Sequence, residues 1–586
     1  MESFLRNEIG GKNMKKLFAM LMVGAMTLTA TGCGSNNGSD GGTKKSKDNT
    51  FTVGINQELD GVFSPLYYQS SYDGDVINLV YDSMLKYNVK DELEPSLATE
   101  MPTVSEDGLT YTFKLREGVK FSDDTPLTSS DVKYTFTVIA DPSYSGRMTT
   151  MAENIKGYDD YHSGKAKDLV GIETPDDTTV VFHLEQPQID AVNNFGTMGI
   201  CSDQQFDYKQ GDTKEIESNT STPIGSGPYV LNKYDKATGA SLVKNEKYSG
   251  KGAYAVENII IKKTDTATEL DELKKGTVDL LPNMIEQQKI GPASLDKNLT
   301  YNTYLRAGVG FVGFNTKKGA TADPAVRQAL AYATDRQAFV KNYFAFEEAS
   351  DDMKKKTLGY VPQAYWNPAS KNMSDYVTGK KKVDGLVEYT YDLDQANKLL
   401  DEAGWVKGSN GIREKDGQKL EIKFMATAEN SVLDTLLPMI QKSWKEIGVD
   451  LKTTTVDFNT LTATLPNDAK LGEWNAYFLA TGYTGVADTD SNNNYGSDKD
   501  GKPYADNYAR IVDEELNGYL DAGYRTSDAK VSTQNYLKAM ERANELIPYL
   551  PLYANNYFDL YSNRVKGLET SPVHTWSLAM DKVTLE

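Results

Sequence analysis

Acidic and amide side chains alternate in the loop that begins at residue 488. Asp488, Asp490 and Asn492 occupy every second position there. Carboxylate and amide oxygens are ligands that Ca²⁺ accepts, so a calcium loop is one interpretation. It is disfavoured because a loop of the EF type needs glycine at its sixth position and glutamate at its twelfth, where Asn493 and Lys499 stand. This polar loop is still the most informative segment of the chain for ligand chemistry.

The chain lacks the motifs of the common hydrolases. It contains no GxSxG nucleophile turn, no HExxH helix and no cysteine–histidine pairing, and its three histidines, His162, His183 and His574, are far apart in sequence. His183 lies in the alternating stretch 178–184, which favours a structural sheet residue over a ligand. We predict no enzyme, no cofactor and no metal site; a secreted hydrolase with a carboxylate pair stays open as a remote alternative.

Composition indicates a large soluble globular body. The 586 residues carry 63 basic and 83 acidic side chains, for a net charge of −20, and no basic stripe. This balance disfavours nucleic acid as a partner. Cysteine occurs only at Cys33 and Cys201. If Cys33 is modified, no internal disulfide can form, and Cys201 is predicted to be a small buried side chain.

The N-terminus has the pattern of a secretory signal. Two lysines follow Met14, an apolar run covers 17–28, and small residues precede Cys33. Ala-Thr-Gly-Cys at 30–33 resembles a lipobox, although leucine usually occupies the first position. We predict cleavage of 1–32, lipidation of Cys33 and a flexible tether over 33–49, with either Met1 or Met14 as the start.

Alternating strands and amphipathic helices predict an α/β fold. A buried strand over 309–314 ends in a turn and is followed by a helix capped by Asp323, with Pro324 in its first position. A strand over 421–427, a helix over 433–447 and a strand from 449 form a second unit. Nearer the start, an apolar helix is predicted over 76–85, after a tyrosine-rich loop.

The amino-acid sequences of several segments resemble those of a known protein family. Five segments occur in the expected order along the chain: EPSLATEMPTVSEDGLTYTFKLREGVKFSDDTPLTSSDV from Glu94, IGSGPYVL from Ile224, FNT followed by DPAVRQALAYATDR from Phe314, LLDEAGW from Leu399 and IPYLPLY from Ile547. Together they resemble the extracellular solute-binding proteins of peptide-type ABC importers, family 5. The resemblance runs from Thr50 to the C-terminus.

The resemblance implies a periplasmic-binding-protein-like fold, with two α/β lobes around a ligand cleft, a hinge between them and a small domain inserted in the N-terminal lobe. The expected division is lobe I at 50–88, 221–305 and 546–586; the inserted domain at 89–220; and lobe II at 306–545.

The implied function is that of a substrate-binding lipoprotein, anchored by lipid to the outer face of the cell membrane. It would capture oligopeptides or dipeptides as a monomer and deliver them to permease subunits backed by ATPase subunits. An oligosaccharide or another small solute is the alternative ligand on the same fold, since 36 tyrosines offer faces for sugars. A sensing or adhesion lipoprotein of the same fold is a further alternative.

The resemblance also implies the site residues. Asp488 matches the aspartate that pairs with a peptide's α-ammonium group in oligopeptide-binding relatives, with Asp490 as a second possibility. Tyr483 is the nearest aromatic to the place where relatives carry tryptophan. The remaining predicted ligand contacts are Tyr68, Gln69, Ser70, Ser71, Asn283, Phe311 and Tyr553.

Overall fold

The computed structural model describes residues 49–586, except 357, 429, 484, 486 and 499. The predicted signal peptide, the lipidation site at Cys33 and nearly all of the predicted tether lie outside the described residues. Asn49–Glu586 forms one compact unit. Across the part of the chain that the structure describes, no helix combines the length and apolar character needed to cross a membrane.

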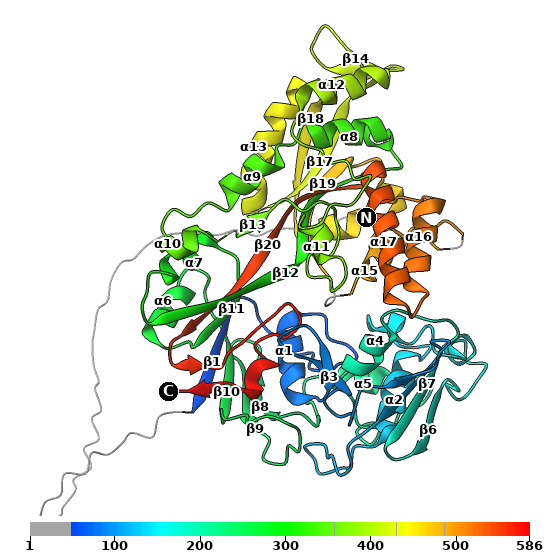
Figure 1. Cartoon of the computed structure of the whole chain (residues 1–586), viewed down its shortest axis with the longest axis vertical. Helices are drawn as coiled ribbons and strands as arrows, with labels where there is room; N and C mark the ends of the chain where they lie inside the picture. Colours follow the sequence, from blue (N-terminus) through cyan, green and yellow to red (C-terminus); the bar gives the residue numbers. More distant parts are fainter. Residues whose placement is uncertain (1–48, 357, 429, 484, 486, 499) are drawn as a thin grey trace, which may run out of the picture. The chain divides into compact units, whose positions relative to one another are not determined.

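One mixed sheet of eleven strands runs through the unit (Figure 1). Its order is β18 (Asp450–Val456), β17 (Glu421–Thr427), β19 (Ala476–Gly482), β12 (Leu299–Phe314), β20 (Tyr549–Ser562), β11 (Leu280–Met284), β1 (Thr50–Ile55), β10 (Asn258–Lys263), β9 (Gly239–Lys244) and β8 (Tyr229–Asp235), with β13 (Gly359–Tyr360) paired to β20. The α/β class and the strands expected at 309–314 and 421–427 are confirmed.

The two longest strands, β12 and β20, lie side by side and connect the two halves of the sheet (Figure 1). β12 pairs with β19 only from Gly308 onwards, whereas β20 pairs with β11 only from Phe558 onwards. The register between β12 and β20 shifts between Leu305 and Val309. The pairing partners of both strands therefore change close to a register irregularity.

A separate four-stranded sheet lies wholly within residues 89–220. Its order is β4 (Thr103–Val104), β5 (Thr110–Lys114), β7 (Thr179–His183) and β6 (Ile172–Asp176). Helix α2 (Ser129–Ile139) contacts it and begins with a capping box, in which Thr128 and Asp131 satisfy each other's backbone N–H groups. The lobe and domain boundaries themselves stay a prediction.

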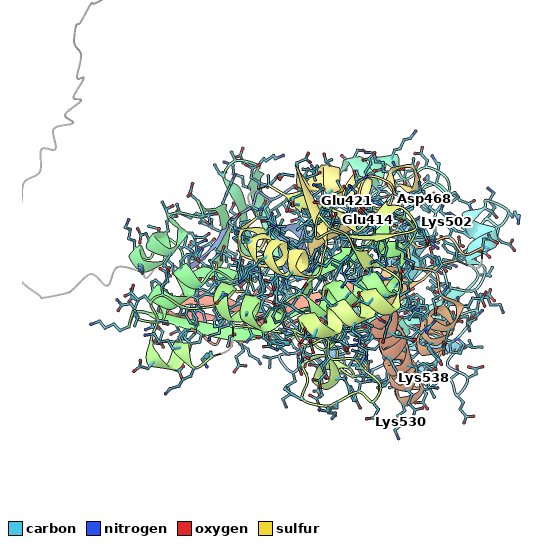
Figure 2. All side chains as sticks on the ribbon, turned by 90° about the horizontal axis from the view of Figure 1, so that it is seen from above. Glu414, Glu421, Asp468, Lys502, Lys530 and Lys538 are labelled. Carbon is cyan, nitrogen blue, oxygen red and sulfur yellow. The ribbon has the colours of Figure 1, made fainter. Side chains whose placement is uncertain are left out.

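Side-chain caps explain where most of the other main helices begin. The helices are α1 (Ser71–Val80), α4 (Ala191–Thr197), α6 (Glu269–Lys275), α7 (Gln287–Ala293), α8 (Pro324–Tyr332), α9 (Arg336–Tyr343), α12 (Leu393–Glu402), α13 (Ser431–Glu446), α14 (Phe458–Thr464), α15 (Asp490–Tyr495), α16 (Glu514–Tyr524) and α17 (Ala529–Leu546). Of these described helices, α4, α6, α7 and α15 have no side-chain cap. Asp323 caps α8 as predicted, accepting from the N–H of Ala325 at 3.0 Å. On α17, Lys530 and Lys538 point to solvent (Figure 2), while Tyr536 and Met540 are buried.

The prediction of a helix over 76–85 is wrong in its bounds. Helix α1 begins at Ser71 because the Ser70 hydroxyl accepts from the N–H of Tyr72 at 3.2 Å. It ends at Val80 because Tyr81 takes an extended backbone conformation. The prediction relied on the apolar residues of the buried face, and the first turn of the helix was not included because it is polar.

Candidate ligand cleft

Asp488 is a buried carboxylate held by two neutral donors. Its side chain accepts from Trp366 Nε1 at 2.8 Å and from Ser370 Oγ at 2.9 Å. The neighbouring Asn367 amide donates to the carbonyls of Gly485 and Ala487 at 3.1 and 3.0 Å. The segment 366–370 therefore fixes both the loop and the direction of the carboxylate.

Burial makes the negative charge on Asp488 unfavourable. The residue is only 7% exposed, and desolvation raises its pKa to about 7, with the nearby Asp490 carboxylate adding a smaller rise. The hydrogen bonds from Ser370 and Trp366 oppose that rise. Among the described residues, no lysine, arginine or histidine forms an ion pair with Asp488.

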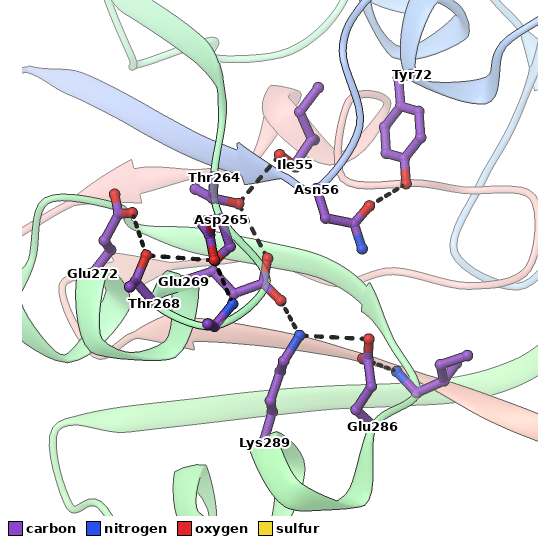
Figure 3. Close-up of polar contacts among 12 residues, drawn as sticks. Ile55, Asn56, Tyr72, Thr264, Asp265, Thr268, Glu269, Glu272, Glu286 and Lys289 are labelled. Atoms are coloured by element: carbon purple, nitrogen blue, oxygen red, sulfur yellow. Dashed lines mark hydrogen bonds and ion pairs between the residues drawn. The ribbon is translucent and has the colours of Figure 1, made fainter. Parts of the chain in front are cut away.

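A second buried charge cluster shows how the fold compensates charge elsewhere (Figure 3). Lys289 lies between Glu269, with which it forms a short ion pair, and Glu286, whose Oε1 is 3.5 Å from its Nζ. Thr264 Oγ1 adds a donor to Glu269 at 3.1 Å. This cluster is satisfied internally. Asp488 differs because its described partners carry no charge.

Asp490 and Tyr483 lie close to Asp488 in different surroundings. Asp490 is the first residue of α15 and is half-buried. Tyr483 is 8% exposed, its backbone N–H donates to Ala307 O at 2.8 Å, and its ring centroid lies 6.1 Å from that of Tyr365. The tyrosine is thus part of an aromatic cluster next to the loop.

Two other predicted contacts lie in aromatic packing. Phe311 is 2% exposed, with its ring 4.5 Å from that of Tyr365 and 5.3 Å from that of Tyr549. Tyr553 is 6% exposed, and its ring lies 5.4 Å from that of Phe344. Both side chains support the sheet in this conformation, and contact with a ligand stays a prediction for them.

The four residues of the predicted segment 68–71 differ in their surroundings, and a ligand contact stays a prediction for them. Tyr68 is half-buried, and the Arg147 guanidinium lies 4.5 Å from its ring centroid. Gln69 and Ser71 are exposed, whereas the Ser70 hydroxyl caps α1. Ser70 therefore orients the helix behind the segment.

Asn283 lies in a polar group on the β11 side. It is exposed, has a positive φ of 58°, and accepts from Tyr304 Oη at 2.8 Å. Its N–H donates to Asp559, a buried carboxylate whose pKa burial raises to about 6. Asparagine tolerates this backbone conformation, which places the amide beside Tyr304.

A cavity of ≈ 180 Å³ brings distant segments together. Tyr68 from the loop before α1 and Gly485 from the loop before Asp488 both line it. Asn283, Phe311 and Tyr553 are not among its lining residues. Of the ten predicted contact residues only Tyr68 lines this cavity; Asp488, Asp490, Tyr483 and the remaining six do not.

Sequence reasoning missed Trp366 and Ser370. Both lie more than 110 positions before Asp488, as the hydrogen-bond separations of 122 and 118 residues show. No local spacing relates them to the loop. Within the described residues, no group of three or more histidine, cysteine, aspartate or glutamate side chains could hold a metal ion.

The chain matches the family "Bacterial extracellular solute-binding proteins, family 5 Middle" over residues 92–503. The oligopeptide-binding protein AppA of Bacillus subtilis is 25% identical over 586 residues, covering 97% of this chain and 99% of the relative. Heme-binding protein A of Haemophilus influenzae is 27% identical over 576 residues, covering 95% and 97%.

Solved structures share the fold. AppA from Bacillus subtilis in complex with a nonapeptide has a TM-score of 0.72 at 24% identity, covering 92% of this chain and 99% of that one. NikZ from Campylobacter jejuni in complex with Ni(L-His) has a TM-score of 0.73 at 21% identity, with the same coverage. These relatives are named for binding different solutes and are not named as enzymes. The chain belongs to family 5 of the bacterial extracellular solute-binding proteins, which serve ABC importers.

Proposed function

We propose that this protein captures peptides between its lobes and delivers them to the permease subunits of an ABC importer. The observation that carries the proposal is Asp488, a buried carboxylate with neutral donors and no ion-pair partner among the described residues. A peptide's α-ammonium group would supply the opposite charge. Burying that ammonium without a partner would cost several kcal/mol, so the pair favours a ligand with a free amino terminus.

The named relatives support a peptide without deciding it. AppA is described as an oligopeptide-binding protein, whereas heme-binding protein A and NikZ are named for other solutes. Within the described residues, no cluster of histidine, cysteine, aspartate or glutamate side chains could ligate a free metal ion. Asp488 offers a single carboxylate, which suits an ammonium group better.

Native mass spectrometry of the purified chain, followed by mild denaturation, tests the ligand class directly. Peptides released from the wild-type chain and absent from Asp488→Asn would support the proposal. A matched control, Asp500→Asn, changes an exposed acidic residue in the same part of the chain and should retain the peptides. A released sugar, or no binding of any peptide from a random library in calorimetry, would overturn the peptide assignment.

The second part of the proposal is a lipid anchor on Cys33 with cell-surface localisation. It rests on the signal pattern and the lipobox resemblance of residues 14–33. Cys33→Ser should release the protein into the medium or the periplasm and abolish incorporation of a labelled fatty acid. Retention of the label in that variant would refute the assignment.

A further inference from the structure

The predicted inserted domain, residues 89–220, contacts the predicted lobe II directly, beside α16 and α17. The backbone N–H of Ile189 donates to the carbonyl of Tyr524, the last residue of α16, at 3.0 Å. Burial raises the pKa of the Tyr524 hydroxyl, and the carboxylates of Asp190 and Glu153 add to that rise. The inserted domain therefore meets lobe II through both its backbone and its side chains.

A tight turn provides a second contact. Gly108 lies between β4 and β5 and has a positive φ of 69°. A Cβ added to Gly108 would lie 2.7 Å from Ser527 Oγ and 2.8 Å from Ser527 Cβ, well inside the roughly 3.5–4.0 Å at which carbon atoms pack. Ser527 belongs to the short connection between α16 and α17. Glycine is therefore favoured here both by the backbone conformation and by the close approach of lobe II.

The third contact reaches the loop that carries Asp488. The Asp190 side chain accepts a hydrogen bond from the side chain of Thr489, which directly follows Asp488 and precedes α15. Because Thr489 adjoins Asp488, this hydrogen bond restrains the segment that presents the buried carboxylate. The inserted domain is thus connected to the part of lobe II that we propose to contact the ligand.

Hydrogen bonds within the inserted domain hold its side of these contacts in place. Asn154 Nδ2 donates to Gln186 O at 2.7 Å and to Gln188 Oε1 at 3.0 Å. Gln188 Nε2 in turn donates to Asp190 Oδ1 at 2.6 Å. These bonds form without lobe II, so the segment 186–190 loses little conformational freedom when it makes contact.

We infer that the inserted domain is a latch that holds lobe II against it through protein contacts independent of the ligand. The inference goes beyond the proposed function, because it applies to any solute in the cleft and gives the segment 89–220 a role in closure. Each hydrogen bond of the latch should change the ratio of closed to open chains by about 2- to 10-fold. The latch consists of three pairs: Ile189 with Tyr524, Gly108 with Ser527, and Asp190 with Thr489.

Hydrogen exchange measured by mass spectrometry on the full chain, freed of ligand by mild denaturation and refolding, tests the latch. Gly108→Asn adds a Cβ against Ser527, while asparagine tolerates the positive φ. Fragments that cover 186–192 should exchange at least about 10-fold faster in this variant, because the N–H of Ile189 loses its acceptor on lobe II. Gly118→Asn is the matched control and should exchange like the wild type. Gly118 lies in the same segment with a φ of 73°, and no described atom lies within 4 Å of an added Cβ there.

A second substitution separates the latch from local distortion of the turn. Ser527→Gly removes the side chain that the new Cβ meets, so Gly108→Asn combined with Ser527→Gly should exchange within about 3-fold of the wild type. Exchange in Gly108→Asn at the wild-type rate would overturn the latch. Fast exchange that Ser527→Gly does not reverse, or exchange of 186–192 in the wild type at the rate of an unprotected chain, would overturn it as well.

Neither readout involves a ligand. Failure of the latch therefore leaves the proposed peptide function intact, and a different ligand class leaves the latch intact.

Discussion

Replacing Asp488 with asparagine should have opposite effects on stability and on ligand affinity. In the folded chain the pKa of this carboxylate is raised to about 7, against an ordinary value of 3.8. The folded state therefore binds more protons than the unfolded state between those values. The contribution of this carboxyl group to the free energy of unfolding is therefore fully present below about pH 4 and is lost as the pH rises through about 7.

The size of this loss follows from the shift. A difference of about three pKa units corresponds to about 4 kcal/mol at pH 8. Asparagine cannot ionise, so the ligand-free Asp488→Asn variant should be more stable than the wild type at pH 8, by up to about 4 kcal/mol. The difference should vanish near pH 4. Urea denaturation at both pH values measures it.

Binding should change in the other direction. Loss of the carboxylate leaves a buried ammonium unpaired, which costs roughly 3–5 kcal/mol and weakens binding about 150- to 5,000-fold. Wild-type affinity should fall below pH 7, where the ligand must displace a proton from Asp488, and above about pH 8, where the α-amino group loses its own. N-acetylation should weaken peptide binding by the wild type strongly, whereas it should not weaken peptide binding by the variant, because it removes the unpaired ammonium.

Calorimetry with free and N-acetylated forms of one peptide separates these effects. Asp500→Asn is the control and should behave like the wild type in every comparison. A variant that is less stable than the wild type at pH 8 would refute the assignment of an uncompensated buried charge. A variant in which acetylation still weakens peptide binding as strongly as in the wild type would refute the ammonium contact.

Three further perturbations test the framework around the cleft. Asp190 hydrogen-bonds Thr489 in the segment preceding α15, and burial raises its pKa. If this hydrogen bond holds the closed form around the ligand, Asp190→Ala should speed ligand release about 5- to 30-fold in stopped-flow measurements. An unchanged release rate would exclude that role for the Asp190–Thr489 contact. Ser70→Ala removes the cap of α1 and should cost about 0.5–2 kcal/mol in urea denaturation, whereas Ser70→Asp should retain most of it. Gly310→Ala would place a Cβ against the ring of Tyr553 and should lower the unfolding free energy by about 1–3 kcal/mol in urea denaturation, and an unchanged value would refute this clash.

Local patterns were sufficient for much of the fold. The strand ending at Phe314 and the helix capped by Asp323 were predictable because strand alternation, a turn and an N-cap with proline are all local signals. The start of α1 was not predicted, because Ser70 caps a polar first turn that carries no apolar periodicity. Family resemblance, carried by several short segments in order, gave the two-lobed architecture that periodicity alone does not specify.

The sequence by itself determined the family, the α/β class and the acidic loop that contains Asp488. Only the tertiary structure decided the surroundings of that carboxylate, because Trp366 and Ser370 reach it from 122 and 118 residues away. The same holds for the cavity, whose walls come from α1, the methionines near 150 and 198, and Gly485. Residue type and spacing determine which groups are available, whereas burial and charge compensation depend on which distant segments the fold packs together.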